Sequence, residues 1–167
     1  MKTLKIYLLL LLAGIALHPE SVYAQKVKKN KDAVQEAAIK KLIESKSYTF
    51  LAQSVTPLRG RNVSLSYGYD LRVNKDTVVA YLPFFGRAFI APIDPMDNGI
   101  EFTSTKFTYT SVAKKNGYLI TIKPADTKDV RQLFLDVSSN GYASLRIINL
   151  SRDAITFEGY IQPYKKD

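Results

Sequence analysis

The sequence of 167 residues contains no cysteine, no tryptophan and a single histidine, His18. His18 lies in an N-terminal segment with the pattern of a secretory leader, so the mature chain is expected to contain neither histidine nor cysteine. A chain without these residues cannot form a Ser-His-Asp relay, a Cys-His pair or a zinc site of His and Cys ligands. We therefore predict a protein that is not an enzyme and that uses no cofactor and no metal ion.

The leader consists of two lysines followed by an apolar run, Ile6–Leu17. This run is shorter than the roughly 20 apolar residues of a spanning helix, but it suits the apolar region of a signal peptide. The small side chain of Ala24 predicts cleavage between Ala24 and Gln25. Because no cysteine follows the run, a lipoprotein anchor is excluded. We predict a signal peptide over residues 1–24 and a periplasmic or extracellular mature protein, with no transmembrane helix after cleavage.

The net charge of +9 is concentrated near the chain ends. Residues 25–31 carry four lysines and no acid, whereas residues 32–163 carry a net charge of only +3. Lysines clustered in a short terminal segment are typical of a solvated, flexible stretch. The alternative is weak contact with anionic lipid or polysaccharide, which salt would weaken. We predict no binding to nucleic acid.

The remaining sequence, residues 32–163, predicts one domain with an N-terminal helix and a β-sheet. Apolar residues recur every three or four positions over Asp32–Lys46, which predicts a helix with one face packed on the domain. From Tyr48 onward the period changes to alternation, clearest over Leu65–Val73, and turn residues such as Asn116-Gly117 separate the alternating runs. We predict a mainly β fold of about 8–10 strands, an antiparallel meander closed as a barrel or folded as a sandwich. The sequence does not define an oligomeric state.

Aromatic residues and one arginine crowd into a short segment after Tyr81. Pro83 is expected to end a strand, and Gly86 permits a tight bend. The rings either plug one end of the core or line a concavity in which Arg87 orients an anionic or sugar ligand. The absence of tryptophan argues against a sugar. The candidate ligand-binding residues are Tyr67, Tyr69, Tyr81, Phe84, Phe85, Arg87 and Phe89.

This segment also carries a family resemblance. The motif Leu82-Pro83-Phe84-Phe85-Gly86-Arg87-Ala88, together with Gly99–Phe102, Asn140–Leu145 and Ile155–Gly159, resembles a family of exported Bacteroidetes proteins catalogued only as a domain of unknown function. The similarity covers roughly residues 35–162. It implies export and the extent of the domain, and it transfers no catalytic residue.

Three further interpretations follow from particular residues. A carboxylate-based hydrolase acting on envelope or glycan material would need two acids across a cleft, for which Asp94, Asp97 and Glu101 are candidates. The same oxygens could bind calcium, although their spacing is not that of an EF-hand. A protein inhibitor or assembly partner would instead present a flat, exposed aromatic patch. Separately, Asp76-Thr77-Val78 resembles an O-glycosylation acceptor with Thr77 as the modified residue.

Overall fold

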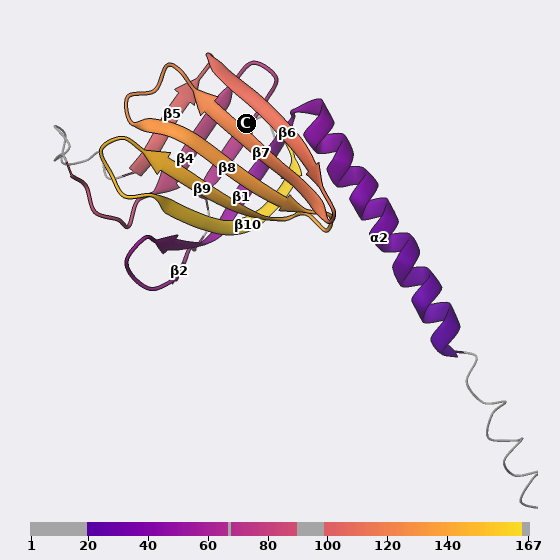
Figure 1. Ribbon diagram of the computed structural model, residues 1–167. Helices are drawn as coiled ribbons and strands as arrows, with labels where there is room; N and C mark the ends of the chain where they lie inside the picture. Colours follow the sequence, from indigo (N-terminus) through magenta and orange to yellow (C-terminus); the bar gives the residue numbers. More distant parts are fainter. Residues whose placement is uncertain (1–19, 67, 90–98, 165–167) are drawn as a thin grey trace, which may run out of the picture. The chain divides into compact units, whose positions relative to one another are not determined.

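A computed structural model describes residues 20–66, 68–89 and 99–164 of the chain. Contacts within the chain divide it into two compact units, Met1–Val34 and Gln35–Asp167. The second unit contains every strand described here and the last part of the helix (Figure 1). In these ranges no helix is long and apolar enough to cross a membrane. The predicted signal sequence lies mostly in residues 1–19, outside the described residues.

The helix α2 spans Glu20–Ser45. Its end agrees with the predicted end at Lys46, but it begins well before the predicted start at Asp32. Residues 25–31, which were predicted to be flexible, therefore lie within α2. The helix continues through them because the whole span lacks Gly and Pro and is rich in Ala, Glu and Lys, which favour helices. It stops at Lys46, which adopts a left-handed φ of 51°, while the Lys46 amide donates to Ile43 O at 3.2 Å.

Ten strands follow the helix. They are β1 (Tyr48–Pro57), β2 (Val63–Ser64), β3 (Asp70–Val73), β4 (Val78–Pro83), β5 (Gly99–Ser104), β6 (Phe107–Lys114), β7 (Gly117–Pro124), β8 (Val130–Ser138), β9 (Tyr142–Asn149) and β10 (Ile155–Pro163). Their number agrees with the predicted range.

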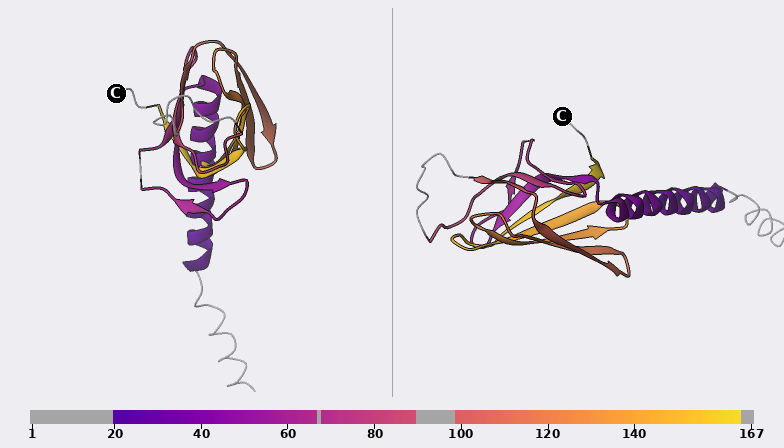
Figure 2. Two further views of the ribbon diagram at one scale, coloured as in Figure 1. Left: turned by 90° about the vertical axis from the view of Figure 1, so that its left-hand side faces the viewer. Right: turned by 90° about the horizontal axis from the view of Figure 1, so that it is seen from above.

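Nine of these strands form one antiparallel path in the order β5-β4-β3-β1-β10-β9-β8-β7-β6, and β2 pairs with β1 beside it. Figure 2 shows these strands curving around a common interior. The two end strands of the path, β5 and β6, are consecutive in the chain, and within the described ranges no backbone pairing joins them. The fold is thus a nearly closed barrel, which decides between the predicted barrel and sandwich in favour of the barrel.

The barrel interior is filled by the inward-facing side chains of the strands. Tyr48, Phe50 and Phe157 are among the largest fully buried side chains. Strand β6 contributes only half-buried rings to this core, and Ile39 and Ile43 of α2 join it from outside the sheet. Burying a large apolar side chain stabilises a fold by about 1.5–3 kcal/mol, so the inward-facing side chains of these strands favour a sheet that curves around them.

The clearest strand predicted from the sequence, Leu65–Val73, is only partly correct. Strand β3 begins at Asp70, and Leu65 and Tyr69 lie outside any strand although their backbones still bond to β1. Two features interrupt the strand. Gly68 adopts a left-handed φ of 87°, and β1 carries an irregularity between Ala52 and Ser54. The chain therefore loops outward between β2 and β3. Tyr67 lies outside the described residues.

Other predicted turns and strands are confirmed. Strands β6 and β7 form a hairpin in which Lys114 pairs with Gly117, and Gly117 has the positive φ (141°) that favours glycine. Strand β4 ends at Pro83, as predicted, and pairs there with Gly99 of β5. After β4, Ala88 forms an isolated bridge with Arg152, and residues 90–98 lie outside the described residues.

Candidate functional site

One row of the sheet carries three tyrosines on the outer face of the barrel. The register pairs Glu101 with Tyr81, Tyr81 with Asp70, Asp70 with Leu51, Leu51 with Tyr160 and Tyr160 with Tyr142. The row therefore crosses six strands, and each member is half-buried or exposed while at least one of its chain neighbours is buried. Outward positions on a half-buried sheet are usually polar, so aromatic residues repeated along one row are a feature that the core does not require.

Tyr81 contacts a tyrosine that lies outside this row. Its ring stacks on that of Tyr69, with the centroids 5.7 Å apart and the planes inclined by 20°. Tyr69 is held in place because its carbonyl accepts a 2.9 Å hydrogen bond from the Ala52 amide, whereas 47% of the Tyr81 surface remains exposed. The pair thus forms a flat aromatic surface with one face open to solvent.

A hollow of about 360 Å³ lies beside this pair, beneath the loop between β2 and β3. Strand β1 provides its floor, the loop one wall, and Tyr160 of β10 the other. Its described lining residues are Leu51, Ala52, Gln53, Leu65, Ser66, Gly68, Tyr69 and Tyr160. The irregularity of β1 at Gln53 and the outward course of the loop together create the space.

A second hollow, of about 350 Å³, adjoins the first. It lies between the end of α2 and the start of β9, and the 2.6 Å hydrogen bond from Gln35 Nε2 to Asn140 O crosses its rim. Its described lining residues are Gln35, Ile39, Gln53, Asn140, Gly141, Tyr142, Tyr160 and Ile161. Because the two hollows share Gln53 and Tyr160, we describe them together as the tyrosine groove.

The tyrosine groove contains no charged side chain among its described lining residues. It offers phenol rings, the amides of Gln35, Gln53 and Asn140, and the hydroxyl of Ser66. Amides and hydroxyls both donate and accept hydrogen bonds. The groove is therefore suited to a neutral ligand that has both polar groups and apolar faces.

The predicted aromatic segment is divided by the structure into parts with different surroundings. Tyr81 stacks on Tyr69, which lines the tyrosine groove, whereas Phe84 is half-buried and packs against the core. The guanidinium of Arg152 lies over the Phe84 ring, 5.1 Å from its centroid. Phe85 and Phe89 remain 46% and 65% exposed. The segment is thus neither a single pocket nor a plug of the core.

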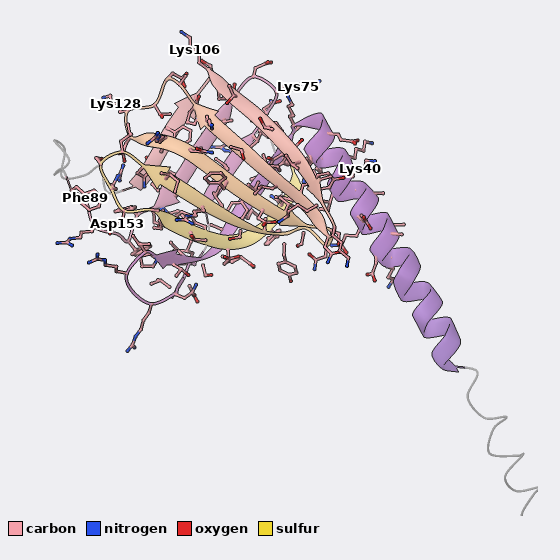
Figure 3. All side chains as sticks on the ribbon, in the orientation of Figure 1. Lys40, Lys75, Phe89, Lys106, Lys128 and Asp153 are labelled. Atoms are coloured by element: carbon pink, nitrogen blue, oxygen red, sulfur yellow. The ribbon has the colours of Figure 1, made fainter. Side chains whose placement is uncertain are left out.

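The backbone of residues 87–89 is fixed although these side chains are exposed. The Phe89 amide donates to Ser151 O at 2.8 Å, and the Asp153 amide donates to Arg87 O at 2.9 Å. Figure 3 shows Phe89 and Asp153 on the same side of the barrel. Arg87 itself is exposed. Phe85, Arg87 and Phe89 therefore form a second candidate surface, which we call the aromatic loop.

A third hollow, of about 350 Å³, is lined by acidic side chains and is therefore the place to test the hydrolase hypothesis. Glu101, Asp126 and Asp129 line it, together with Lys128 and Arg152. Hydrogen bonds from the Ser104 hydroxyl and the Thr105 amide lower the pKa of Asp126 to about 2. Burial raises the pKa of Asp129, but bonds from Ser151 and Arg152 lower it overall. A general acid needs a raised pKa, and both shifts go the other way.

The other predicted sites are less informative. Asp94 and Asp97 lie outside the described residues. Within the described ranges, no group of three or more His, Asp or Glu side chains is placed to hold a metal ion. Thr77 is half-buried at the end of the turn between β3 and β4, where its carbonyl accepts a 2.8 Å hydrogen bond from the Asn74 amide. Its glycosylation stays a prediction.

Tyr142 and Tyr160 are absent from the residues predicted from the sequence. Each lies in a strand where buried and outward positions alternate, and each occupies an outward position. In β10, for example, Ile155, Phe157 and Ile161 face inward, and Tyr160 lies between inward positions. A search for tyrosines at such outward positions would have found them. The sequence could not have shown that they lie in the same row as Tyr81, because this depends on which strands pair.

Comparison with known proteins agrees with the fold and the motif. Residues 30–161 match the family described as Domain of unknown function (DUF4251). The chain is also similar to a crystal structure of a DUF4251 family protein from Bacteroides eggerthii DSM 20697, with 15% sequence identity and a TM-score of 0.55 over 80% of this chain and 91% of that chain. No curated protein matches the sequence. The resemblance inferred from the motif around Phe84 is thereby confirmed.

Proposed function

Since the chain belongs to the DUF4251 family, a domain of unknown function, we propose that it is a non-enzymatic domain of the bacterial cell envelope that binds a small ligand or an envelope partner through outward-facing aromatic side chains. The observation that carries this proposal is the stacked pair of Tyr69 and Tyr81 beside the tyrosine groove. A flat aromatic surface next to a hollow with convergent polar groups is the usual form of a ligand site.

Export is supported by the sequence of the first 24 residues, with its lysines, apolar run and small residue at Ala24. The basic residues that follow could then contact anionic lipid or polysaccharide. A direct test is the N-terminal sequence of the protein isolated from its own host. We expect it to begin at Gln25, and a chain that begins at Met1 would contradict export by this route.

The proposal of a non-enzymatic role is supported by residue chemistry. Outside the predicted leader, the sequence has no histidine or cysteine to act as base or nucleophile. Asp126 and Asp129 accept hydrogen bonds from Ser104 and Arg152, which hold them as structural carboxylates. Both acids are therefore accounted for by contacts that fix loops.

The proposed binding surface is tested by native mass spectrometry of protein purified from its own host. We expect a bound mass in the wild type that is lost in Tyr81→Ala, because this variant removes the exposed ring of the stacked pair. Tyr81→Phe should keep the mass, since it retains the ring. If Tyr81→Ala keeps the bound mass while folding normally, ligand binding at this pair is wrong.

A second candidate is protein docking at the aromatic loop, and the exposure of Phe85 and Phe89 on a fixed backbone favours it. The variants Phe85→Ala and Phe89→Ala test it in the same preparation. Loss of a co-purifying protein in these variants, with the small ligand retained, would assign partner binding to the loop. Loss of the small ligand instead would move the ligand site to the loop.

A further inference from the structure

We infer that the tyrosine groove binds a neutral oligosaccharide, which lies along the groove from Tyr69, the ring that stacks on Tyr81, to Tyr142. The inference rests on the proposed function and names the ligand class for the same surface. It follows from three properties of the groove: its charge, the spacing of its rings and the pairing of the strands in its floor.

The charge of the groove selects against ionic ligands. None of its described lining residues carries a charge, although the sequence as a whole has a net charge of +9. Phosphate and carboxylate groups are normally bound by Arg or Lys, or by a helix N-terminus. The amides of Gln53 and Asn140 instead match neutral hydroxyl groups, which both donate and accept hydrogen bonds.

The tyrosines provide surfaces on which sugar rings can stack. The sequence has no tryptophan, whose large ring often serves this purpose, and this absence argued against a sugar ligand. In the structure, tyrosines in neighbouring positions provide aromatic rings in place of tryptophan. Tyr69 stacks on Tyr81 at one end of the row, and Tyr142 is paired with Tyr160 across β9 and β10 at the other. Tyr69, Tyr142 and Tyr160 thus all line the groove.

The spacing of the two pairs requires an extended ligand. Tyr69 is bonded to β1 at Ala52, β1 is paired with β10, and β10 is paired with β9, so three steps between neighbouring strands separate Tyr69 from Tyr142. At about 4.8 Å a step, this distance is roughly 14 Å along the sheet. One sugar ring cannot contact both pairs, so a chain of several sugars is needed.

The pairing of the groove floor argues against a peptide. Extended peptides commonly bind by adding a strand to a free sheet edge. Strand β1 is paired with β10 on one side and with β2 and β3 on the other, and β10 lies between β1 and β9. Neither β1 nor β10 therefore has a free edge in the groove floor, so a ligand lying on this floor must be recognised by side chains.

Isothermal titration calorimetry tests the inference with full-chain protein purified from its own host. The probes are soluble dextran, mannan, galactan and xylan, which are neutral, and alginate and chondroitin sulfate, which are anionic. We expect binding to at least one neutral polysaccharide, with an affinity that raised salt leaves unchanged, because no described charge of the groove contributes. Oligosaccharides of four or more sugars should bind more tightly than the matching disaccharide.

Three variants locate the site. Tyr142 is 63% exposed, so Tyr142→Ala should fold normally and weaken binding between about twofold and tenfold, the range for one aromatic contact. Tyr160→Phe retains the half-buried ring and should keep most of the affinity. Val112→Ala, which shortens an exposed side chain of β6 that lines neither hollow, is the matched control and should bind as the wild type does.

Failure of this inference can be distinguished from failure of the proposed function. If none of the neutral polysaccharides binds, if the anionic ones bind more tightly, or if Tyr142→Ala binds with full affinity, the inference is overturned. The proposed function depends on Tyr81 alone and stands in each case if Tyr81→Ala loses the native bound mass.

Discussion

Arg152 Nε lies 2.7 Å from Asp129 Oδ2, and this ion pair connects the end of β9 with the start of β8. A second nitrogen of the same guanidinium donates to Gly99 O at 2.7 Å, and its plane lies over the Phe84 ring. One side chain thus fixes strand β5, the segment after β4 and the loop that precedes β10. The backbone bonds of its chain neighbours Ser151 and Asp153 hold the adjacent aromatic loop.

We expect Arg152→Ala to destabilise the protein by about 2–4 kcal/mol, because it leaves the carboxylate of Asp129 largely buried without its charged partner. The two side chains are only 12% and 18% exposed. Urea unfolding measures the change. Arg131→Ala, an exposed arginine of β8, is the control and should stay within about 0.5 kcal/mol of the wild type. Equal stability of both variants would contradict the role assigned to Arg152.

The carboxylate of Asp126 predicts a dependence of stability on acid pH. Hydrogen bonds from the Ser104 hydroxyl and from the Thr105 and Lys106 amides lower its pKa from 3.8 to about 2. A group whose pKa is lowered by folding stabilises the folded state above its unfolded pKa. This contribution is lost as pH falls from about 4 to about 2.

Urea unfolding over this pH range should therefore show a smaller loss of stability in Asp126→Ala than in the wild type. Thr103→Ala, an exposed position of β5, serves as the control and should follow the wild-type profile. If Asp126→Ala loses stability as steeply as the wild type does, the carboxylate does not make the predicted contribution.

The surroundings of Gly159, where β1 pairs with β10, predict that no larger side chain fits at this position. A Cβ at this position would overlap the backbone carbonyl of Leu51, which cannot move without disturbing the strand. We expect Gly159→Ala to cost about 2–3 kcal/mol, and thermal or urea unfolding would measure it. Gly68→Ala is the comparison, because it has open space but a positive φ, and it should cost only about 1 kcal/mol. The reverse order would contradict the overlap at Leu51.

The sequence alone determined much of this protein. Alternation of apolar residues in β8, β9 and β10, with turn residues between them, specified an antiparallel β fold, because side chains on a strand point alternately to two faces. The same pattern identified most strands and their hairpin partners. The motif around Phe84 identified the family, and Tyr69 and Tyr81 were recognised as candidate site residues before their stacking was known.

Only the tertiary structure decided the rest. Local pattern does not reveal that β1 pairs with β10, a contact between strands about 100 residues apart in the chain. That pairing closes the barrel and brings Tyr160 into the same row as Tyr81. The contact of Arg152 with Phe84 likewise depends on the tertiary structure, and it separates Phe84 from Phe85 and Phe89, which stay exposed. Hydrophobic periodicity reports which face of a strand is buried, whereas a binding surface depends on which strands meet.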